Sequence, residues 1–111
     1  MLKVLGPDGV SSAYVALTRE SFGRSQTLIV VDEKRARFNL SGYSVKVVVR
    51  RISDGRVFEE TASVVDAVNG VVGWAPDGRN FPSEGSYVAR LRLEKAGETI
   101  ETSGFIISVE K

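Results

Sequence analysis

The amino-acid sequence predicts an all-β domain of about 7–8 short strands arranged as a sandwich or barrel. Turn signals recur along the chain, and the runs between them are rich in β-branched and aromatic residues. These runs alternate apolar and polar residues with a period of two, and no window carries the apolar stripe of a helix. Turns are expected at Pro7–Gly9, Ser41–Gly42, Ser53–Gly55, Asn69–Gly70, Pro76–Gly78 and Ala96–Gly97.

Two strands are expected in the first third of the chain. Residues 12–17 place Ala13, Val15 and Leu17 on one face of an extended segment. Residues 26–32 contain four consecutive apolar residues, so both faces are apolar, as is typical of a central strand. Residues 1–22 as a whole fit a compact core least well. They are expected to form either the first strand of the same sandwich or an N-terminal arm that pairs with a neighbour.

A β-hairpin is expected in the middle of the chain. Residues 43–51 alternate valines with Lys46 and Arg50, and a buried helix here would also bury those charges. The turn Ser53–Gly55 connects this strand to a second strand over residues 56–62.

The last part of the chain holds the clearest alternation. Residues 63–74 carry valine pairs on both sides of Asn69–Gly70, which indicates either a second tight hairpin or two strands that cross between sheets. Residues 87–94 form a half-buried strand, and residues 95–98 turn into a final strand that includes 105–109. The inward faces are expected to hold Tyr87, Ala89, Leu91, Leu93, Phe105, Ile107 and Val109.

Length and composition indicate one ordinary globular domain. The chain has 111 residues, 42% of them hydrophobic and 26% charged, which suits one core and is too little for two. A single domain over residues 1–111 is therefore expected. The net charge of +1 does not suit a general binder of polyanions, so no nucleic-acid partner is expected.

No membrane or secretion signal is expected. No apolar run approaches the ~18 residues that a membrane-spanning helix needs. The first residues, Met1–Pro7, break before the core of a signal peptide could form, which predicts synthesis in the cytoplasm without a signal peptide.

The residue types argue against catalysis. Histidine and cysteine are both absent, so Ser–His–Asp and Cys–His arrangements cannot be built and the usual zinc ligands are missing. Asp8 and Asp77 each stand alone in a Pro-Asp-Gly turn, without the spaced oxygen ligands of a calcium loop. The glycines form no phosphate-binding loop. We therefore expect no enzymatic activity, no cofactor and no bound metal.

Two segments remain candidates for interaction. Lys34–Arg37 is the one basic cluster; contact with phosphate or an acidic partner is one interpretation, and a solvated loop beside flanking acids is the favoured one. Trp74 and Phe81 flank a polar loop that contains Asp77 and Arg79. The two rings are either core residues or, together with Asp77 and Arg79, a contact patch, because Trp, Phe and Arg are enriched in interfaces.

A series of short motifs follows Gln26 in a characteristic order. It comprises the strand Gln26–Val31, the Leu-Ser-Gly step within Phe38–Val47, the Asp-Gly turn of Arg50–Gly55, the strand Val68–Val72, the Gly-x-Tyr start of Glu84–Ala89, and the last turn and strand at Ala96–Glu98 and Phe105–Val109. In this order the motifs resemble the immunoglobulin-like N-terminal domain of phage baseplate upper proteins and related phage virion Ig-like modules.

The resemblance implies an immunoglobulin-like antiparallel β-sandwich of about 7–8 strands. Gly85-x-Tyr87 fits the tyrosine corner of such sandwiches, in which the hydroxyl bonds to backbone upstream. The implied function is that of a non-enzymatic structural protein of the virion, from the baseplate, the tail or a capsid accessory. Its implied partners are other phage structural proteins or further copies of itself, reached through an exposed strand edge or an aromatic loop. The alternative is a carbohydrate- or cell-surface-binding Ig-like module that uses the loop from Trp74 to Phe81.

Overall fold

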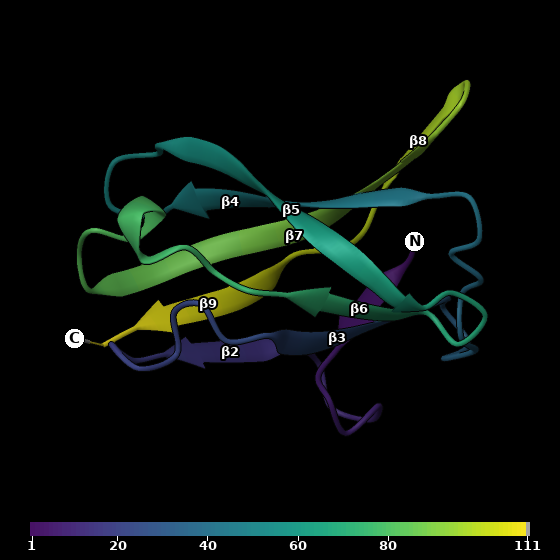
Figure 1. Cartoon of the computed structure of the whole chain (residues 1–111), viewed down its shortest axis with the longest axis horizontal. Helices are drawn as coiled ribbons and strands as arrows, with labels where there is room; N and C mark the ends of the chain where they lie inside the picture. The colour runs from purple at the N-terminus through teal and green to yellow at the C-terminus, as the bar shows by residue number, and fades with distance from the viewer. Residues whose placement is uncertain (111) are drawn as a thin grey trace.

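A computed structural model of the chain describes residues 1–110, so Lys111 of the predicted domain lies outside the described residues. These residues form nine strands and one turn of 3-10 helix, η1 (Figure 1). The elements are β1 Lys3–Leu5, β2 Tyr14–Leu17, β3 Gln26–Val31, β4 Ser44–Arg51, β5 Val57–Asp66, β6 Val71–Trp74, η1 Gly78–Asn80, β7 Gly85–Lys95, β8 Glu98–Glu101 and β9 Phe105–Val109.

The strands follow one hydrogen-bonded path that folds into two layers. The order is β1-β3-β6-β5-β4-β7-β9-β2, with β8 paired to β7. The first layer is β1-β3-β6-β5, and the second contains β4, β7 and β9 side by side. If β2 and β8 are left out, the remaining strands can be lettered A to G in chain order. The first layer is then ABED and the second is CFG, as in immunoglobulin domains. The predicted all-β, Ig-like fold class is therefore confirmed.

One strand, β5, belongs to both layers. Its first part, from Val57 to Ala62, pairs with β4 as the predicted hairpin. Its second part, from Ser63 to Asp66, pairs with β6, and the register shifts between Val64 and Asp66. The two interpretations of residues 63–74 therefore both hold in part, since the segment is a hairpin built on a strand that crosses between layers.

Residues 1–22 contribute one short strand to each layer. Strand β1 pairs antiparallel with β3, and β2 pairs parallel with β9, so that Tyr14 lies opposite Ile106. The alternation of Ala13, Val15 and Leu17 toward the core follows the sequence pattern, with exposures of 6%, 6% and 0%.

The core lies between the two layers and follows the predicted alternation. On β7 and β9, every second side chain points inward, and the residues between them face outward. The largest fully buried side chains are Trp74, Tyr87 and Phe81. The central position of β3 is also confirmed, since it pairs with β1 on one side and β6 on the other and buries four consecutive apolar residues.

The expected final strand is divided into β8 and β9, which corrects the sequence interpretation. On β7, Ala89 pairs with Phe105 of β9 and Arg92 pairs with Glu101 of β8. Two residues of β7, 90–91, therefore face three residues of the connecting segment, 102–104. The Thr102 hydroxyl accepts the Leu91 N–H at 3.0 Å and donates to the carbonyl of Ser103 at 2.9 Å. This bulge ends β8 because the threonine side chain takes a hydrogen bond of the ladder.

Candidate functional site

The two aromatic rings of the expected contact patch lie inside the core. Trp74 ends β6 and Phe81 follows η1, and both side chains are 0% exposed. The Phe81 ring packs edge-on against Tyr87 at 4.9 Å and Phe58 at 5.1 Å between ring centroids. Such T-shaped contacts add to the burial of apolar area. Of the two interpretations, core or surface, the structure therefore places both rings in the core.

The polar members of the same patch remain at the surface and pair with each other. The Asp77 carboxylate accepts the backbone N–H of Arg79 at 3.0 Å, and the Arg79 guanidinium donates to Oδ1 at 3.1 Å and to Oδ2 at 2.8 Å. The Arg79 hydrogen bonds hold the pKa of Asp77 below its usual value. This ion pair shapes η1, and a partner would meet two charges that already neutralise each other.

Glu60, on the neighbouring strand β5, holds this loop in place through hydrogen bonds of its carboxylate. Its carboxylate accepts the Trp74 indole N–H at 3.0 Å, the Asp77 backbone N–H at 3.1 Å and the Asn80 side-chain amide at 2.8 Å. The sequence gave no indication of this role, because Glu60 is one of two adjacent acidic residues in an expected strand.

Replacing Glu60 with alanine is expected to lower the free energy of unfolding by about 2 kcal/mol, since the buried Trp74 N–H loses its acceptor. Urea unfolding followed by Trp74 fluorescence would measure the change. The matched control is Glu59→Ala, which removes an exposed ion pair with Arg92 and should cost less than about 1 kcal/mol. Equal losses for the two variants would contradict the role of Glu60.

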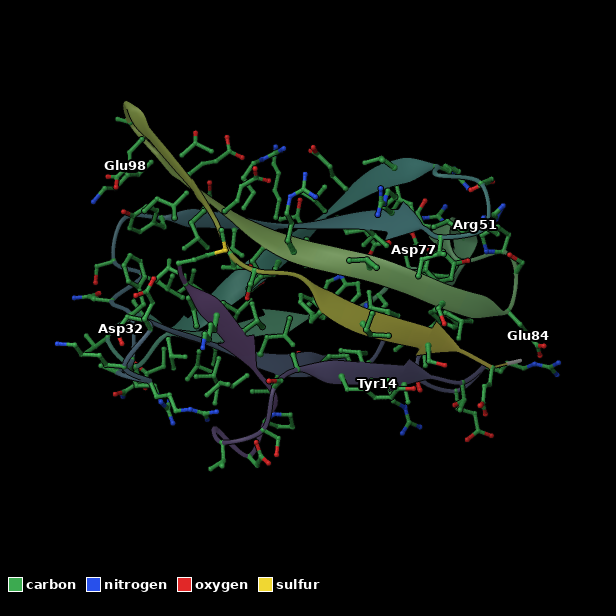
Figure 2. The ribbon with its side chains drawn as sticks, turned by 180° about the vertical axis from the view of Figure 1, so that it is seen from behind. Tyr14, Asp32, Arg51, Asp77, Glu84 and Glu98 are labelled. Carbon is green, nitrogen blue, oxygen red and sulfur yellow. The ribbon has the colours of Figure 1, made fainter. Side chains whose placement is uncertain are left out.

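Tyr87 occupies the expected tyrosine corner. Its ring is 1% exposed, and its hydroxyl donates to the carbonyl of Ser83 at 3.0 Å. Beside it, the Arg51 guanidinium binds the Asp54 carboxylate at 3.0 Å and the Ser83 hydroxyl at 3.3 Å (Figure 2 labels Arg51). The corner prediction is confirmed, and these bonds join the start of β7 to the β4–β5 turn.

The basic cluster Lys34–Arg37 forms a capped loop. The Asp32 carboxylate accepts the backbone N–H groups of Lys34 and Ala36 at 2.8 and 3.0 Å. Arg35 donates to the carbonyl of Val10 at 2.6 Å, and Arg37 donates to the carbonyl of Asn69 at 3.1 Å. Both guanidinium groups are thus used to connect loops of this chain, in line with the favoured interpretation as a solvated loop.

A different feature stands out at one end of the molecule. The ribbon made by the end of β7 and by β8 projects beyond the sandwich (Figure 1). Among the described residues, β8 pairs only with β7, so its other edge is open. The sequence interpretation missed this edge because it merged β8 with β9. A usable signal was present in the tight turn at Ala96–Gly97, which requires two paired strands around it.

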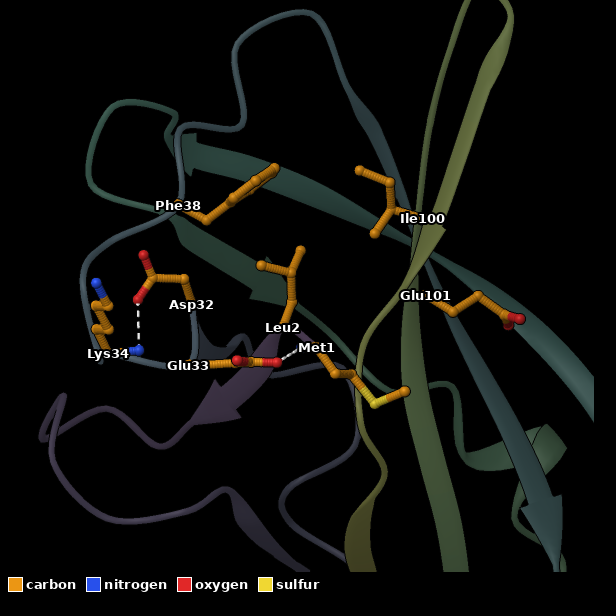
Figure 3. A pocket seen from close by; sticks show the side chains of 8 residues that line it. All are labelled: Met1, Leu2, Asp32, Glu33, Lys34, Phe38, Ile100 and Glu101. Carbon is orange, nitrogen blue, oxygen red and sulfur yellow. Dashed lines mark hydrogen bonds and ion pairs between the residues drawn. The ribbon is translucent and has the colours of Figure 1, made fainter.

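A hollow of about 630 Å³ lies beside this open edge (Figure 3). Its apolar part is formed by Leu2, Phe38 and Ile100, which come from three separate segments of the chain. The N-terminal amine and the Glu33 carboxylate form an ion pair at its rim. The remaining lining residues are Met1, Asp32, Lys34 and Glu101.

The described residues contain no group of three or more acidic side chains placed to hold a metal ion. Within residues 1–110, no helix has the length and apolar character needed to cross a bilayer.

One protein family and several solved structures are similar to this chain. The chain is similar to the N-terminal domain of phage TP901-1 ORF48, with 22% identity and a TM-score of 0.66, over 89% of this chain and 86% of that one. It can also be superposed on murine CRIg, with 15% identity and a TM-score of 0.41, over 100% and 99% of the two chains. No curated protein matches the chain in sequence. The model of the BppU N-terminal domain, from phage baseplate upper proteins, matches residues 10–111. The chain therefore belongs to the BppU N-terminal domain family of phage baseplate proteins.

Proposed function

We propose that the chain is a non-enzymatic docking module of the virion that binds other phage structural proteins through the open edge of β8. Membership in a baseplate family supports the structural role. Docking through this edge is supported by the projecting β7–β8 ribbon, because an unpaired strand edge can bind an extended segment of another protein by strand addition.

The hydrogen-bond pattern identifies which backbone groups such a segment would meet. The N–H of Thr102 donates to the carbonyl of Leu91 at 3.0 Å, so this pair is hydrogen-bonded. In an antiparallel ladder, pairs that exchange hydrogen bonds alternate with pairs that do not. Glu101 and Thr99 belong to pairs that do not, so their backbone N–H and C=O groups point away from β7, toward the open edge. An added strand can bond to these groups.

The hollow supplies a position for a side chain of the added segment. Ile100 lies on β8 itself, and Leu2 and Phe38 continue the apolar surface away from it (Figure 3). In strand addition, main-chain bonds give affinity and a pocket beside the edge gives specificity. A segment with one apolar side chain directed into the hollow fits this arrangement.

The test is binding to the purified baseplate proteins of the same phage, measured by biolayer interferometry. Thr99→Pro removes the outward N–H at the open edge, where proline is tolerated in a strand. Thr99→Val keeps that N–H and is the matched control. We expect Thr99→Pro to weaken binding about tenfold, the loss of about 1.4 kcal/mol of main-chain bonding, and Thr99→Val to bind as the parent chain does. Equal affinities for all three would rule out docking at this edge.

The alternative of glycan binding at the loop from Trp74 to Phe81 gains no support. Stacking on a sugar needs an accessible ring, and both rings are 0% exposed. We therefore propose no carbohydrate site at this loop.

A further inference from the structure

The outer face of the layer that contains β2, β9, β7 and β4 is divided into two unlike halves. Toward the ribbon, the outward side chains are charged and paired: Arg92 binds Glu59 at 2.7 Å and Glu94 at 3.2 Å. Arg90 binds Glu101, and Lys46 lies 3.9 Å from Glu94. This half has the composition expected of a sheet face in water.

The other half carries fewer charges and contains a row of three apolar side chains followed by one arginine. Tyr14 on β2 lies opposite Ile106 on β9, Ile106 lies opposite Val88 on β7, and Val88 lies opposite Arg50 on β4. Tyr14 is 64% exposed and Ile106 is 39% exposed. Tyr14 lies on β2 in the foreground of Figure 2. A solvent-facing row of this kind is typical of a protein contact surface.

A second row runs beside the first and consists of small or apolar residues. Ala16 on β2 lies opposite Ser108 on β9, and Ser108 lies opposite Ser86 on β7. The N–H of Ile52 donates to the carbonyl of Ser86, which continues the row onto the segment after β4. Ile52 is 54% exposed. The second row thus begins with a small residue and ends with a large one.

Arg50 is the charged member of the first row. Among residues 1–110, its guanidinium takes part in no ion pair, in contrast to the arginines of the charged half. An unpaired arginine in the same row as an exposed tyrosine and isoleucine gives the face the composition of an interface hot spot.

We infer that this face binds the same face of a second copy of the chain, across a two-fold axis that runs parallel to the strands between β9 and β7. That axis places Tyr14 of each copy over Arg50 of the other, and Ile106 over Val88. In the second row it places Ala16 over Ile52, and Ser108 over Ser86. An isologous contact requires such self-complementarity, and a guanidinium over a tyrosine ring is a favourable cation–π contact.

Each copy contributes about two rows of side chains, which is smaller than a standard protein interface. The dimer is therefore weak and concentration-dependent in free solution. The surface is separate from the open edge of β8, so self-association and docking at that edge are independent and compatible.

The first test is the molar mass of the purified chain by sedimentation equilibrium from about 10 μM to about 1 mM. The expected mass rises from 12.1 kDa toward twice that value. Tyr14→Lys should weaken dimerisation about tenfold or more. Val68→Lys is the matched control, because Val68 is 65% exposed and lies in a turn away from this face. A constant mass of 12.1 kDa, or a dimer that Tyr14→Lys leaves intact, overturns the inference.

A second test checks the geometry and uses the absence of cysteine in the sequence. Ala16 and Ile52 of one chain are separated by three strand spacings, about 14 Å, which is too far for a disulfide within the chain. A mixture of Ala16→Cys and Ile52→Cys proteins should form a covalent dimer on mild oxidation, several times faster than either protein alone. Equal cross-linking of the mixture and the single proteins overturns the proposed axis.

Discussion

Replacement of Tyr87 with alanine is expected to lower the free energy of unfolding by about 3–5 kcal/mol. The ring is 1% exposed and packs against Phe81 at 4.9 Å, and its hydroxyl bonds to the carbonyl of Ser83. The variant therefore loses apolar burial, an aromatic contact and the corner hydrogen bond. Such a loss is a large part of the total stability of a domain of this size.

The control for this experiment is Tyr87→Phe, which keeps the ring and removes only the hydroxyl. It should cost about 1 kcal/mol, the usual contribution of one hydrogen bond. Urea titrations followed by circular dichroism would measure both variants. A loss below about 1 kcal/mol for Tyr87→Ala would mean that the corner does not stabilise the fold as described.

Gly70→Ala is expected to destabilise the domain by about 3–4 kcal/mol, because it combines an unfavourable backbone conformation with steric overlap. Gly70 has a φ of +68°, and a Cβ atom added to it would lie 2.5 Å from the carbonyl oxygen of Val30 and 2.9 Å from that of Phe38. The left-handed conformation alone costs an alanine about 1–2 kcal/mol, and the two contacts with backbone oxygens force β3 and the segment after it to move.

Gly42→Ala separates these two contributions. Gly42 has a φ of +82°, and among the described residues no atom lies within 4 Å of an added Cβ. The free energy of unfolding of this variant should therefore fall only by the cost of the left-handed conformation, about 1–2 kcal/mol. Thermal unfolding of both variants would give the difference. Equal changes in the melting temperature would show that the close approach at Gly70 has no energetic effect.

The local pattern of the sequence was sufficient where one face of a strand is buried. The alternation from Tyr87 to Leu93 predicted the inward face of β7, because a one-residue shift would expose every apolar side chain. The division between β8 and β9 could not be predicted in this way. It depends on the Thr102 hydroxyl taking the N–H of Leu91, a contact between two strands that alternation does not encode.

The candidate sites show the same limit. A tryptophan and a phenylalanine around a polar loop suit either a core or a surface, and the Glu60 carboxylate that accepts the indole N–H of Trp74 lies on another strand. The apolar row on the outer face joins Tyr14 to Ile106 through the parallel pairing of β2 with β9. These residues lie near opposite ends of the chain, so their proximity requires the complete fold.

The parallel pairing of β2 with β9 also determines how the domain responds to tension. The strands run side by side in the same direction, with Tyr14–Leu17 paired to Ile106–Val109. A pull on the N-terminal side of β2 against the C-terminal side of β9 acts along both strands. Their hydrogen bonds are then loaded in shear and have to break together, whereas an antiparallel pair pulled from adjacent ends opens one bond at a time. The β2–β9 pair should therefore resist this direction of pulling more strongly than an antiparallel pair pulled from adjacent ends.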